Sequence, residues 1–449
     1  MSPFALPDDL AGRSAAELAF RLCASGSPDE VRPFWADGGR SQGEFSPGRH
    51  LLAAHPTRVG EIRVETLPFR GLANWLRTEP RLATQRDGLL ALGLSYDAGR
   101  SMERIATLAE TDPILPDVVF AEYPAYIHGD SENGPWELWA TDRRAAEELI
   151  NTLRFAPSSP SPLIFTHPFA ERTRWEEYED AIQNVLRAIQ AGDLYQANIA
   201  RRIEAPMPAE QTPILYMRMR ESNPSAFGTL WCIGKESWIA SSSPECLFTY
   251  DVESRTAKSY PIKGTRRRGR TPIEDEVYAS ELGADPKELA EHVMIVDLVR
   301  NDLGRVSAPG SVKVSALAKN YRLPTVHHLV SDIEGTLSSS HDLVDLLLAL
   351  FPGGSITGAP KIAAMQKIEE VERVRRGFYT GSVGLIEPDG SANFNILIRT
   401  CVAHRGMLYY QTGGGIVADS TAQKEWDETC AKAHALTSLV NDLDRGRSK

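Results

Sequence analysis

The chain has 449 residues, of which 42% are hydrophobic and 24% charged, and 60 acidic residues outnumber 49 Lys and Arg to give a net charge of −11. This composition is typical of a folded globular protein and excludes disordered, collagen-like and disulfide-scaffold chains. Because nucleic-acid binding depends largely on basic residues that neutralise phosphates, the negative charge argues against a general nucleic-acid-binding protein.

The N-terminus, MSPFALPDDL, carries acidic residues and prolines where a signal peptide needs a cationic start and an apolar stretch. No apolar run approaches about 18 residues, the length that favours a membrane-spanning helix. The 5 cysteines are scattered and form no C-x-x-C pair, so neither a disulfide framework nor a zinc cluster is expected. We therefore expect a cytoplasmic protein with no membrane segment.

A segment rich in proline and serine, APSSPSP at 156–162, can neither continue a helix nor pair within a central strand. It predicts a boundary between an N-terminal region, 1–156, and a second region, 164–445. The N-terminal region contains no compact group of catalytic residue types, so we interpret it as a scaffold. Its predicted elements are strands at 88–96, 117–127 and 136–140 and a helix at 143–153.

The second region begins with apolar residues at helical spacing, which predict a helix over 175–190 that ends at Gly192. Short alternating or apolar runs follow, close enough in sequence to pair as antiparallel strands. The pattern alone predicts a mixed α and β fold. The further predicted elements are strands at 197–203, 226–233, 237–241, 247–250, 381–386, 394–403 and 407–412 and helices at 286–303 and 340–351.

Two helical segments each carry two glutamates three residues apart, a spacing that places both side chains on one helix face. They are Glu288 with Glu291, and Glu425 with Glu428. Glutamate oxygens suit Mg²⁺, which usually takes one or two protein carboxylates and completes its shell with water and substrate. For either pair taken alone, a solvated helix face is the stronger interpretation.

Two glycine-rich segments could hold an anion. The segment FPGGSITGAPK at 351–361 offers backbone amides to a carboxylate or phosphate, but it lacks the spacing of a nucleotide-binding P-loop. The second segment, 413–415, is three glycines at the end of a strand, where a ligand can lie against bare backbone. A simple turn explains either segment equally well.

Lys263 lies between Ile262 and Gly264, just before an arginine run at 266–270. A surface position is the default for a lysine, although burial near a cation site would lower its pKa and make it a nucleophile or base. We expect the arginines to form a solvated loop over the entrance of an anionic substrate. A nucleic-acid surface is less favoured because no aromatic residues are interleaved.

Five motifs, in order along the chain, resemble those of the chorismate-utilising enzymes. No single motif is decisive, but the ordered set is very specific. The resemblance covers about residues 165–440 closely and the N-terminal region more weakly. The motifs are SSPE at 242–245, PIKGT at 261–265, DLVRND at 297–302, GSITGAPK at 354–361 and GGGIVADS at 413–420.

The resemblance implies an α+β fold in which an anthranilate-synthase-like β-sandwich core of antiparallel sheets is wrapped by helices. It also implies that 1–156 is the N-terminal region of a synthase large subunit and that 164–445 is the chorismate-binding catalytic domain.

Within the family, lysine at the position of Lys263 is typical of enzymes that form aminodeoxychorismate, and alanine of those that form anthranilate. The resemblance therefore implies that Lys263 attacks C2 of chorismate as the C4 hydroxyl leaves. Ammonia then displaces the lysine to give 4-amino-4-deoxychorismate. Glu245 matches the general acid that protonates the departing hydroxyl, a task that a pKa raised by burial would help.

The resemblance also gives the two glutamate pairs one purpose. Glu291 and Glu428 match the family's Mg²⁺ ligands, with Glu288 and Glu425 as nearby or water-mediated partners, and the metal would anchor the ring carboxylate. Since chorismate is a dianion, basic residues around it are expected. The remaining matched positions are Arg399, Tyr379 and Lys432 for the carboxylates, Thr357, Gly358, Gly413 and Gly414 along the site, and His328 near the departing group.

Gln196, which we count among the substrate-binding residues, occupies the position where isochorismate and salicylate synthases carry a lysine that activates water. Addition of water is therefore disfavoured. The Leu-Leu-Glu-Ser pattern by which anthranilate synthases sense tryptophan is missing from the first 80 residues, which argues against feedback inhibition by tryptophan.

Nothing in the chain supplies glutamine hydrolysis, because no separate amidotransferase region with a cysteine nucleophile and a partner histidine is present. The resemblance therefore implies a separate glutaminase subunit, for which free ammonia can substitute, and a distinct lyase that completes 4-aminobenzoate for folate synthesis. Two alternatives stay open, namely the large subunit of an anthranilate synthase and a catalytically silent chorismate-binding subunit.

Overall fold

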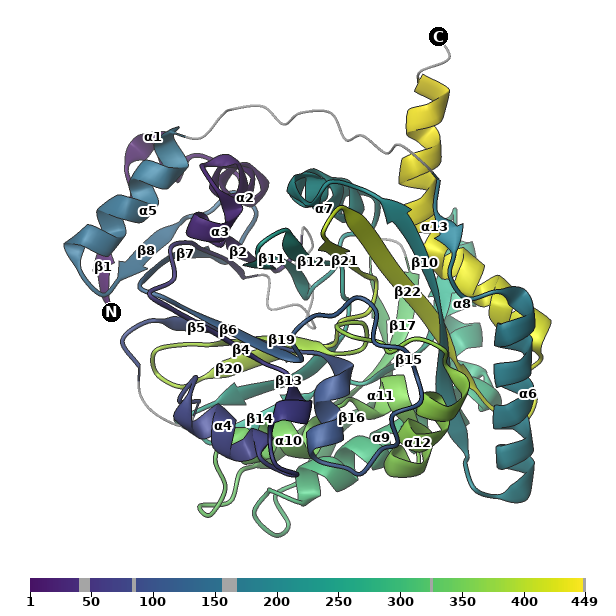
Figure 1. Ribbon diagram of the computed structural model, residues 1–449. Helices are drawn as coiled ribbons and strands as arrows, with labels where there is room; N and C mark the ends of the chain where they lie inside the picture. Colours follow the sequence, from purple (N-terminus) through teal and green to yellow (C-terminus); the bar gives the residue numbers. More distant parts are fainter. Residues whose placement is uncertain (40–48, 83–85, 156–167, 324–325, 447–449) are drawn as a thin grey trace.

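The computed structural model describes residues 1–39, 49–82, 86–155, 168–323 and 326–446, with side chains in the last helix up to residue 439. Two sheets form the centre of the molecule and helices lie outside them (Figure 1). All pairings between the named strands are antiparallel. The expected architecture of antiparallel sheets wrapped by helices is confirmed.

Sheet A contains 12 strands. In spatial order they are β1 (Ser2–Phe4), β8 (Glu137–Ala140), β7 (Ala125–Gly129), β3 (His50–Ala53), β2 (Phe34–Asp37), β11 (Gly228–Gly234), β12 (Ser237–Ser241), β21 (Thr400–His404), β22 (Met407–Ile416), β10 (Gln196–Pro206) and β18 (Gly358–Ala359), with β9 (Ala170–Glu171) beside β10. Strands β2 and β11, which pair directly, come from the two sides of the proline-rich segment, so this sheet is continuous across both regions.

Sheet B contains 10 strands. In spatial order they are β15 (Ile262–Arg267), β17 (Val326–Thr336), β14 (Thr256–Ser259), β13 (Cys246–Asp251), β20 (Ala392–Asn395), β19 (Ser382–Ile386), β5 (Leu89–Leu94), β6 (Val118–Tyr123) and β4 (Arg58–Ile62), with β16 (Lys313–Arg322) beside β17. Strands β19 and β5 join the two regions in this sheet as well. The boundary segment itself, 156–162, lies outside the described residues.

Helices cover the outer faces of both sheets. They are α1 (Asp8–Ala11), α2 (Ala15–Ala24), α3 (Pro28–Val31), α4 (Leu72–Thr78), α5 (Arg143–Phe155), α6 (Trp175–Ala191), α7 (Thr212–Ser222), α8 (Pro272–Ala284), α9 (Pro286–Gly304), α10 (Leu343–Leu350), α11 (Gly354–Thr357), α12 (Lys361–Val371) and α13 (Ala422–Gly446). The part of the chain that the structure describes also contains three short 3-10 helices, at Val64–Thr66, Tyr96–Ser101 and Ala209–Gln211. In the described ranges no helix combines the length and apolar character needed to cross a membrane.

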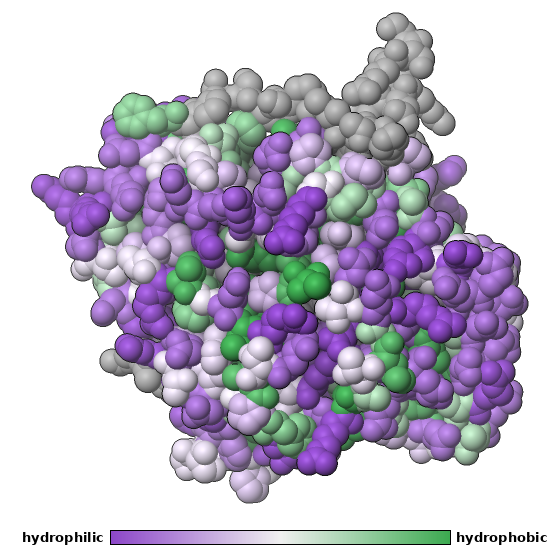
Figure 2. All heavy atoms as spheres, in the orientation of Figure 1, coloured by the Kyte–Doolittle hydropathy of each residue, from purple (hydrophilic) through white to green (hydrophobic). Residues whose placement is uncertain are grey.

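Apolar side chains fill the space between the sheets. Phe34 and Trp231 from sheet A meet Val119 and Val383 from sheet B in one buried cluster. On the outside, α2, α5 and α7 pack on sheet A, α9 packs on β15 and β17, and α6 and α12 pack on β10. The face shown in Figure 2 is mainly hydrophilic, with hydrophobic side chains in small separate areas. The apolar residues are therefore used mainly inside the sandwich and under the helices.

Two predicted strands are each divided between the sheets. The expected strand at 117–127 is β6 in sheet B followed by β7 in sheet A, with Pro124 between them. Proline lacks the N–H that a continuous ladder needs, so the chain turns there. The expected strand at 394–403 is likewise β20 in sheet B and β21 in sheet A. The chain crosses between the sheets at 396–399.

Candidate active site

Two crossings of the chain between the sheets lie side by side. One joins β12 to β13 and ends at Glu245, and the other joins β20 to β21 and ends at Arg399. They are hydrogen bonded to each other, because Ser242 N–H donates to the Arg399 carbonyl at 3.1 Å and Ile396 N–H to the Glu245 carbonyl at 3.0 Å. The fold thus places a carboxyl group and a guanidinium from separate motifs in one neighbourhood.

Glu245 has the properties of a proton donor at neutral pH. Its side chain is buried, and burial raises its pKa to about 7, although a hydrogen bond from Ser355 and the positive charges of Lys263 and Arg399 oppose the rise. Ser355 Oγ donates to Glu245 Oε1 at 2.6 Å. A carboxyl group whose pKa lies near the working pH is suited to general acid catalysis.

Replacing Ser355 with alanine should raise the pKa of Glu245 by about one unit, because a hydrogen bond to a charged group contributes about 1.5 kcal/mol or more and favours the ionised carboxylate. The protonated acid then persists to higher pH, so the alkaline limb of the kcat profile should move upward. A pH profile of the turnover rate measures the shift. Ser340→Ala, an exposed serine outside the site, is the control, and an unmoved alkaline limb in the Ser355 variant would contradict the assignment.

Arg399 is a guanidinium that no carboxylate of the described residues pairs with. Within the described residues its side chain forms no ion pair or hydrogen bond, and burial lowers its pKa, while Tyr410 and Glu245 partly oppose that effect. Its backbone is in the left-handed region, with φ of 51°. A partly buried cation that lacks a carboxylate partner is suited to bind an anionic ligand.

Lys263 is turned by an irregularity in β15. The register between β15 and β17 shifts between Lys263 and Thr265, where Gly264 adopts a φ of +84° that favours glycine. The Lys263 side chain is 19% exposed, and its Nζ donates to Glu291 Oε2 at 3.1 Å. The predicted nucleophile and a predicted metal ligand are therefore in direct contact.

Gln196 faces Lys263 across a glycine. A Cβ added to Gly415 would lie 2.7 Å from Gln196 Nε2 and 3.1 Å from Lys263 Nζ, so both side chains approach this glycine closely and a larger residue would displace them. The Gln196 side chain is fully buried, and neither its amide nitrogen nor its amide oxygen has a hydrogen-bond partner within the described residues. An unpaired buried amide next to an amine is available to a bound ligand.

His328 is a neutral histidine at physiological pH. Burial, assisted by the positive charge of Arg399, lowers its pKa to about 4. Its Nδ1 lies 2.9 Å from Thr265 Oγ1, whereas its buried Nε2 has no partner within the described residues. The ring therefore has one anchored nitrogen and one nitrogen free for a ligand.

Gly358, directly after Thr357, pairs with Ala197 of β10, and Tyr379 lies in the turn that follows Arg376. Thr357 Oγ1 donates to the Gly353 carbonyl at 2.8 Å, so its hydroxyl hydrogen stays within its own loop. A Cβ on Gly358 would lie 2.2 Å from the Gln196 carbonyl oxygen, so the close approach of these segments requires glycine. Tyr379 is buried, and burial raises its pKa well above its usual value.

The first glutamate pair lies at the start of α9. The Asp285 side chain accepts hydrogen bonds from two backbone N–H groups of the first helical turn, which fixes where the helix begins. Glu288 Oε1 lies 3.5 Å from Arg266 Nη1, and Glu291 pairs with Lys263 as described. Both glutamates are thus already in contact with cations of the strand that carries the predicted nucleophile, Lys263.

The second pair lies on α13. Burial raises the pKa of Glu425, and the charge of Glu428 raises it further, so the two carboxylates are close together. A Cβ on Gly414 would lie 3.0 Å from Glu425 Oε2. Burial also acts to raise the pKa of Glu428, but Lys432 outweighs it and lowers that pKa. Lys432 Nζ contacts Glu428 Oε1 at 2.7 Å and the Gly413 carbonyl at 2.8 Å.

The two glutamate pairs offer oxygen donors of the kind that Mg²⁺ takes. Among the residues that the structure describes, no three acidic, histidine or cysteine side chains gather closely enough to hold a metal by themselves. Mg²⁺ needs only one or two protein carboxylates when substrate and water complete its shell. A hydrogen bond to Asp419 raises the pKa of Lys287, and the charges of Glu291 on α9 and Glu425 on α13 raise it further, so this lysine feels carboxylates of both helices.

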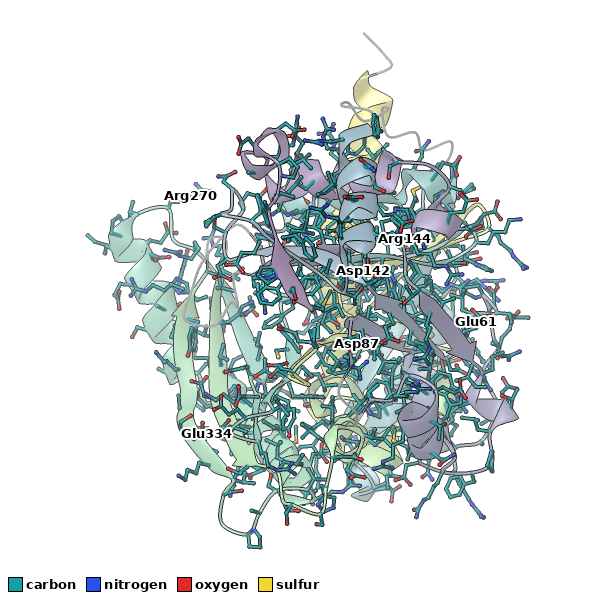
Figure 3. All side chains as sticks on the ribbon, turned by 90° about the vertical axis from the view of Figure 1, so that its left-hand side faces the viewer. Glu61, Asp87, Asp142, Arg144, Arg270 and Glu334 are labelled. Atoms are coloured by element: carbon teal, nitrogen blue, oxygen red, sulfur yellow. The ribbon has the colours of Figure 1, made fainter. Side chains whose placement is uncertain are left out.

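The arginine run is not a free loop over the site. Arg266 lies in β15 and pairs with Asp285 at 3.1 Å, and Arg268 pairs with Asp275 at 2.7 Å. Arg270 lies at the outer edge of the molecule (Figure 3). Arg267 also lies 3.5 Å from Glu274, so acidic residues that follow in sequence pair with three of these arginines, an arrangement that the run alone did not indicate.

The structure adds residues that motif reasoning missed. Ser355 holds Glu245, Thr265 holds His328, and Gly415 makes room for the meeting of Gln196 and Lys263. All three lie within the motifs quoted above, so membership of a motif was the feature of the sequence that could have identified them. Their function follows only from contacts between strands and loops that are distant in sequence.

Residues 33–438 match the family described as chorismate binding enzyme. The chain is 37% identical to anthranilate synthase component 1 of Mycolicibacterium smegmatis over 399 residues, which cover 83% of this chain and 75% of that protein. It is 35% identical to aminodeoxychorismate synthase component 1 of Bacillus subtilis over 394 residues, which cover 82% of this chain and 81% of that protein.

The fold is also similar to the crystal structure of anthranilate synthase component I from Streptococcus pneumoniae. The TM-score is 0.73 at 27% identity, with 88% of this chain and 93% of that chain covered. The family match spans most of the chain, and both relatives exceed 30% identity over more than four fifths of it. This chain is a member of the chorismate binding enzyme family.

Proposed function

We propose that this chain aminates chorismate at C4 to form 4-amino-4-deoxychorismate. The observation that carries the proposal is the meeting of Lys263 Nζ with the buried, unpaired amide of Gln196 around Gly415. A lysine there supplies a nucleophile for the substrate, whereas glutamine in place of a second lysine leaves no base to activate water. Among the relatives, the Bacillus subtilis protein named aminodeoxychorismate synthase component 1 agrees with this assignment.

In the proposed reaction, Lys263 Nζ forms a bond to C2 of chorismate, the ring double bonds shift, and the C4 hydroxyl leaves. Glu245 donates the proton that makes the leaving group water. Ammonia then bonds to C4, the double bonds shift back, and the C2–Nζ bond breaks. Lys263 must act as the free amine, and its contact with Glu291 Oε2, at 3.1 Å, is the one that metal binding would break.

Binding of the dianionic substrate rests on the cations of the site. Arg399 has no carboxylate partner within the described residues, so it can pair with a substrate carboxylate. We assign Tyr379 and Lys432 to the carboxylates as well. His328, neutral and with its Nε2 unpaired among the described residues, is assigned to the departing hydroxyl.

We further propose that Glu291 and Glu428 hold Mg²⁺, with Glu288 and Glu425 as neighbours that orient its water ligands. The ion would offset the charge of the ring carboxylate. Release of Lys263 and Lys432 from their present partners, Glu291 and Glu428, would free both lysines for the reaction and for the substrate.

Replacing Glu428 with glutamine should raise the Mg²⁺ concentration for half-maximal turnover by about 10- to 100-fold, because a neutral amide replaces a charged ligand. A magnesium titration of the turnover rate, with calorimetric titration of Mg²⁺ in the presence of chorismate, measures the change. Glu179→Gln, an exposed glutamate of α6, is the matched control. Identical titrations for the Glu428 variant and wild type would contradict the assignment of Glu428 as a Mg²⁺ ligand.

The ammonia source is proposed to be a separate glutaminase subunit, with a distinct lyase acting on the product. Both relatives described above carry the name component 1, which implies a partner. Glutamine-dependent turnover should then require the added glutaminase, while ammonium salts should support turnover by the chain alone.

Formation of anthranilate is the second candidate, since the Mycolicibacterium smegmatis and Streptococcus pneumoniae relatives are both named anthranilate synthases. Incubation of the purified chain with chorismate, Mg²⁺ and ammonium, with and without an added lyase, separates the two. Appearance of 4-aminobenzoate only with the lyase supports the first proposal. Anthranilate without the lyase supports the second, and unchanged chorismate overturns both.

A further inference from the structure

A buried guanidinium outside the predicted set connects three segments of the site. Arg376 is 2% exposed. Its Nη2 donates to the Asn198 carbonyl at 2.6 Å and its Nη1 to the Ile356 carbonyl at 2.9 Å. Its Nε and Nη2 also donate to the two carboxylate oxygens of Glu372, at 3.0 and 2.7 Å. These four hydrogen bonds, and a longer one from Nη1 to Thr380 Oγ1 at 3.4 Å, fix the plane of this group.

Each of the linked segments carries a predicted substrate-binding residue. The first bound carbonyl lies on β10, two residues after Gln196, and the second comes immediately before Thr357. Arg376 itself begins the turn that leads to Tyr379, and its guanidinium lies 5.9 Å from the centre of the Tyr379 ring. One side chain therefore sets the relative positions of three parts of the substrate site.

The geometry requires an arginine. Glu372 accepts from two guanidinium nitrogens, and it also accepts from the Ala200 N–H at 2.9 Å, so the carboxylate belongs to the same network on β10. The guanidinium also lies over the Tyr96 ring at 4.7 Å. A lysine presents one point charge and cannot make a two-point contact, stack on a ring and reach two carbonyls at once.

Stability alone does not account for the buried Arg376–Glu372 pair. The free energy gained by a buried ion pair is largely offset by the cost of removing both charges from water. A second buried arginine, Arg220, allows a comparison within the same chain. Arg220 is equally buried and pairs with Asp37 at 2.6 Å and with Glu132, but it touches none of the predicted site residues. A purely structural pair and a pair at the site can therefore be compared within one molecule.

We propose that Arg376 is a positioning residue that holds β10, the loop at 354–359 and the turn at 377–381 in their working arrangement. Its effect on turnover rests on the proposed function, whereas its effect on the geometry does not. Because small misplacements of reacting groups can cost about 100-fold in rate, Arg376→Lys should lower kcat with ammonium by about that factor. Arg220→Lys should leave kcat near the wild-type value.

Hydrogen exchange followed by mass spectrometry gives the readout that does not depend on activity. In Arg376→Lys, the amides of all three segments should exchange faster than in wild type, while Arg220→Lys should affect none of them. Glu372→Gln, which keeps the guanidinium but removes its counter-charge, should reproduce the faster exchange and part of the loss in kcat. Unchanged exchange in the three segments of Arg376→Lys would overturn the proposal even if the wild-type chain failed to convert chorismate.

Guanidinium rescue distinguishes positioning from damage to the fold. A cavity of about 40 Å³ is lined by Arg376 and Tyr379, so truncation of Arg376 would leave space that opens into it. Millimolar guanidinium chloride should restore part of kcat to Arg376→Ala and should not activate wild type. If that variant does not fold, Arg376→Lys and Glu372→Gln decide the question. Wild-type kcat and exchange in both of these would refute the proposal.

Discussion

Replacing Lys263 with alanine should lower the rate of chorismate amination by about 1,000-fold or more, because removal of an enzyme's nucleophile costs several kcal/mol of transition-state stabilisation. The lysine is the amine that faces Gln196 across Gly415, and it is in contact with Glu291. Without it, only slow direct attack by ammonia on the bound substrate would persist. Chorismate consumption at saturating ammonium, with an added lyase to convert the product, measures the loss.

Lys258→Ala is the matched control, since Lys258 is 49% exposed and lies 3.9 Å from its acidic neighbour, Glu334, outside the site. This variant should retain the wild-type rate. Incubation of wild type with chorismate in the absence of ammonium should also yield a covalent adduct at residue 263, detectable by mass spectrometry of peptides. A Lys263→Ala variant that turns over chorismate at the wild-type rate would remove the covalent route.

Replacing Arg399 with glutamine should raise the KM for chorismate by at least about 30-fold, because loss of one partner of a buried charged hydrogen bond costs about 2 kcal/mol or more. The same change should alter the pH profile. The positive charge of Arg399 lowers the pKa of both Glu245 and His328. Its loss should therefore raise the pKa of Glu245 above about 7 and the pKa of His328 above about 4. The alkaline limb of kcat should therefore move to higher pH.

Arg405→Gln provides the control for Arg399→Gln. Arg405 is exposed and also has a left-handed backbone, with φ of 47° against 51° for Arg399. Any effect of placing glutamine in this backbone conformation should appear in both variants. A normal KM together with an unshifted pH profile in the Arg399 variant would show that this guanidinium does not bind the substrate.

Features with local causes could be predicted from the sequence. Gly192 ends α6 with a φ of 83°, as a glycine after a helical pattern should. Most strands predicted in the second region lie within a few residues of their observed bounds, because alternation and turn residues act over short distances. The prediction failed at 117–127 and 394–403, where apolar character continues through a crossing between sheets. Periodicity reports burial and does not report which sheet a residue joins.

In the candidate site too, some features follow from local sequence and others only from tertiary structure. The motifs supplied Lys263, Glu245 and the two glutamate pairs, because each is a residue type at a fixed position in a short segment. Their contacts were outside the reach of the sequence. The Lys263 contact with Glu291 joins a strand to a helix 28 residues later, and the Ser355 contact with Glu245 spans 110 residues. Such pairs depend on loop closure and on the packing of whole elements.

By itself the sequence determined the kinds of elements, the antiparallel character of the sheets and the residue types available for chemistry, since these follow from local periodicity, turns and composition. Tertiary structure alone decided that strands from both regions share both sheets, that two crossings place Glu245 beside Arg399, and that Arg376 joins three segments of the site. The physical reason is that these contacts form only when elements distant in the chain bury one another's apolar faces. The groups meeting at the crossings are then fixed by hydrogen bonds that no short segment encodes.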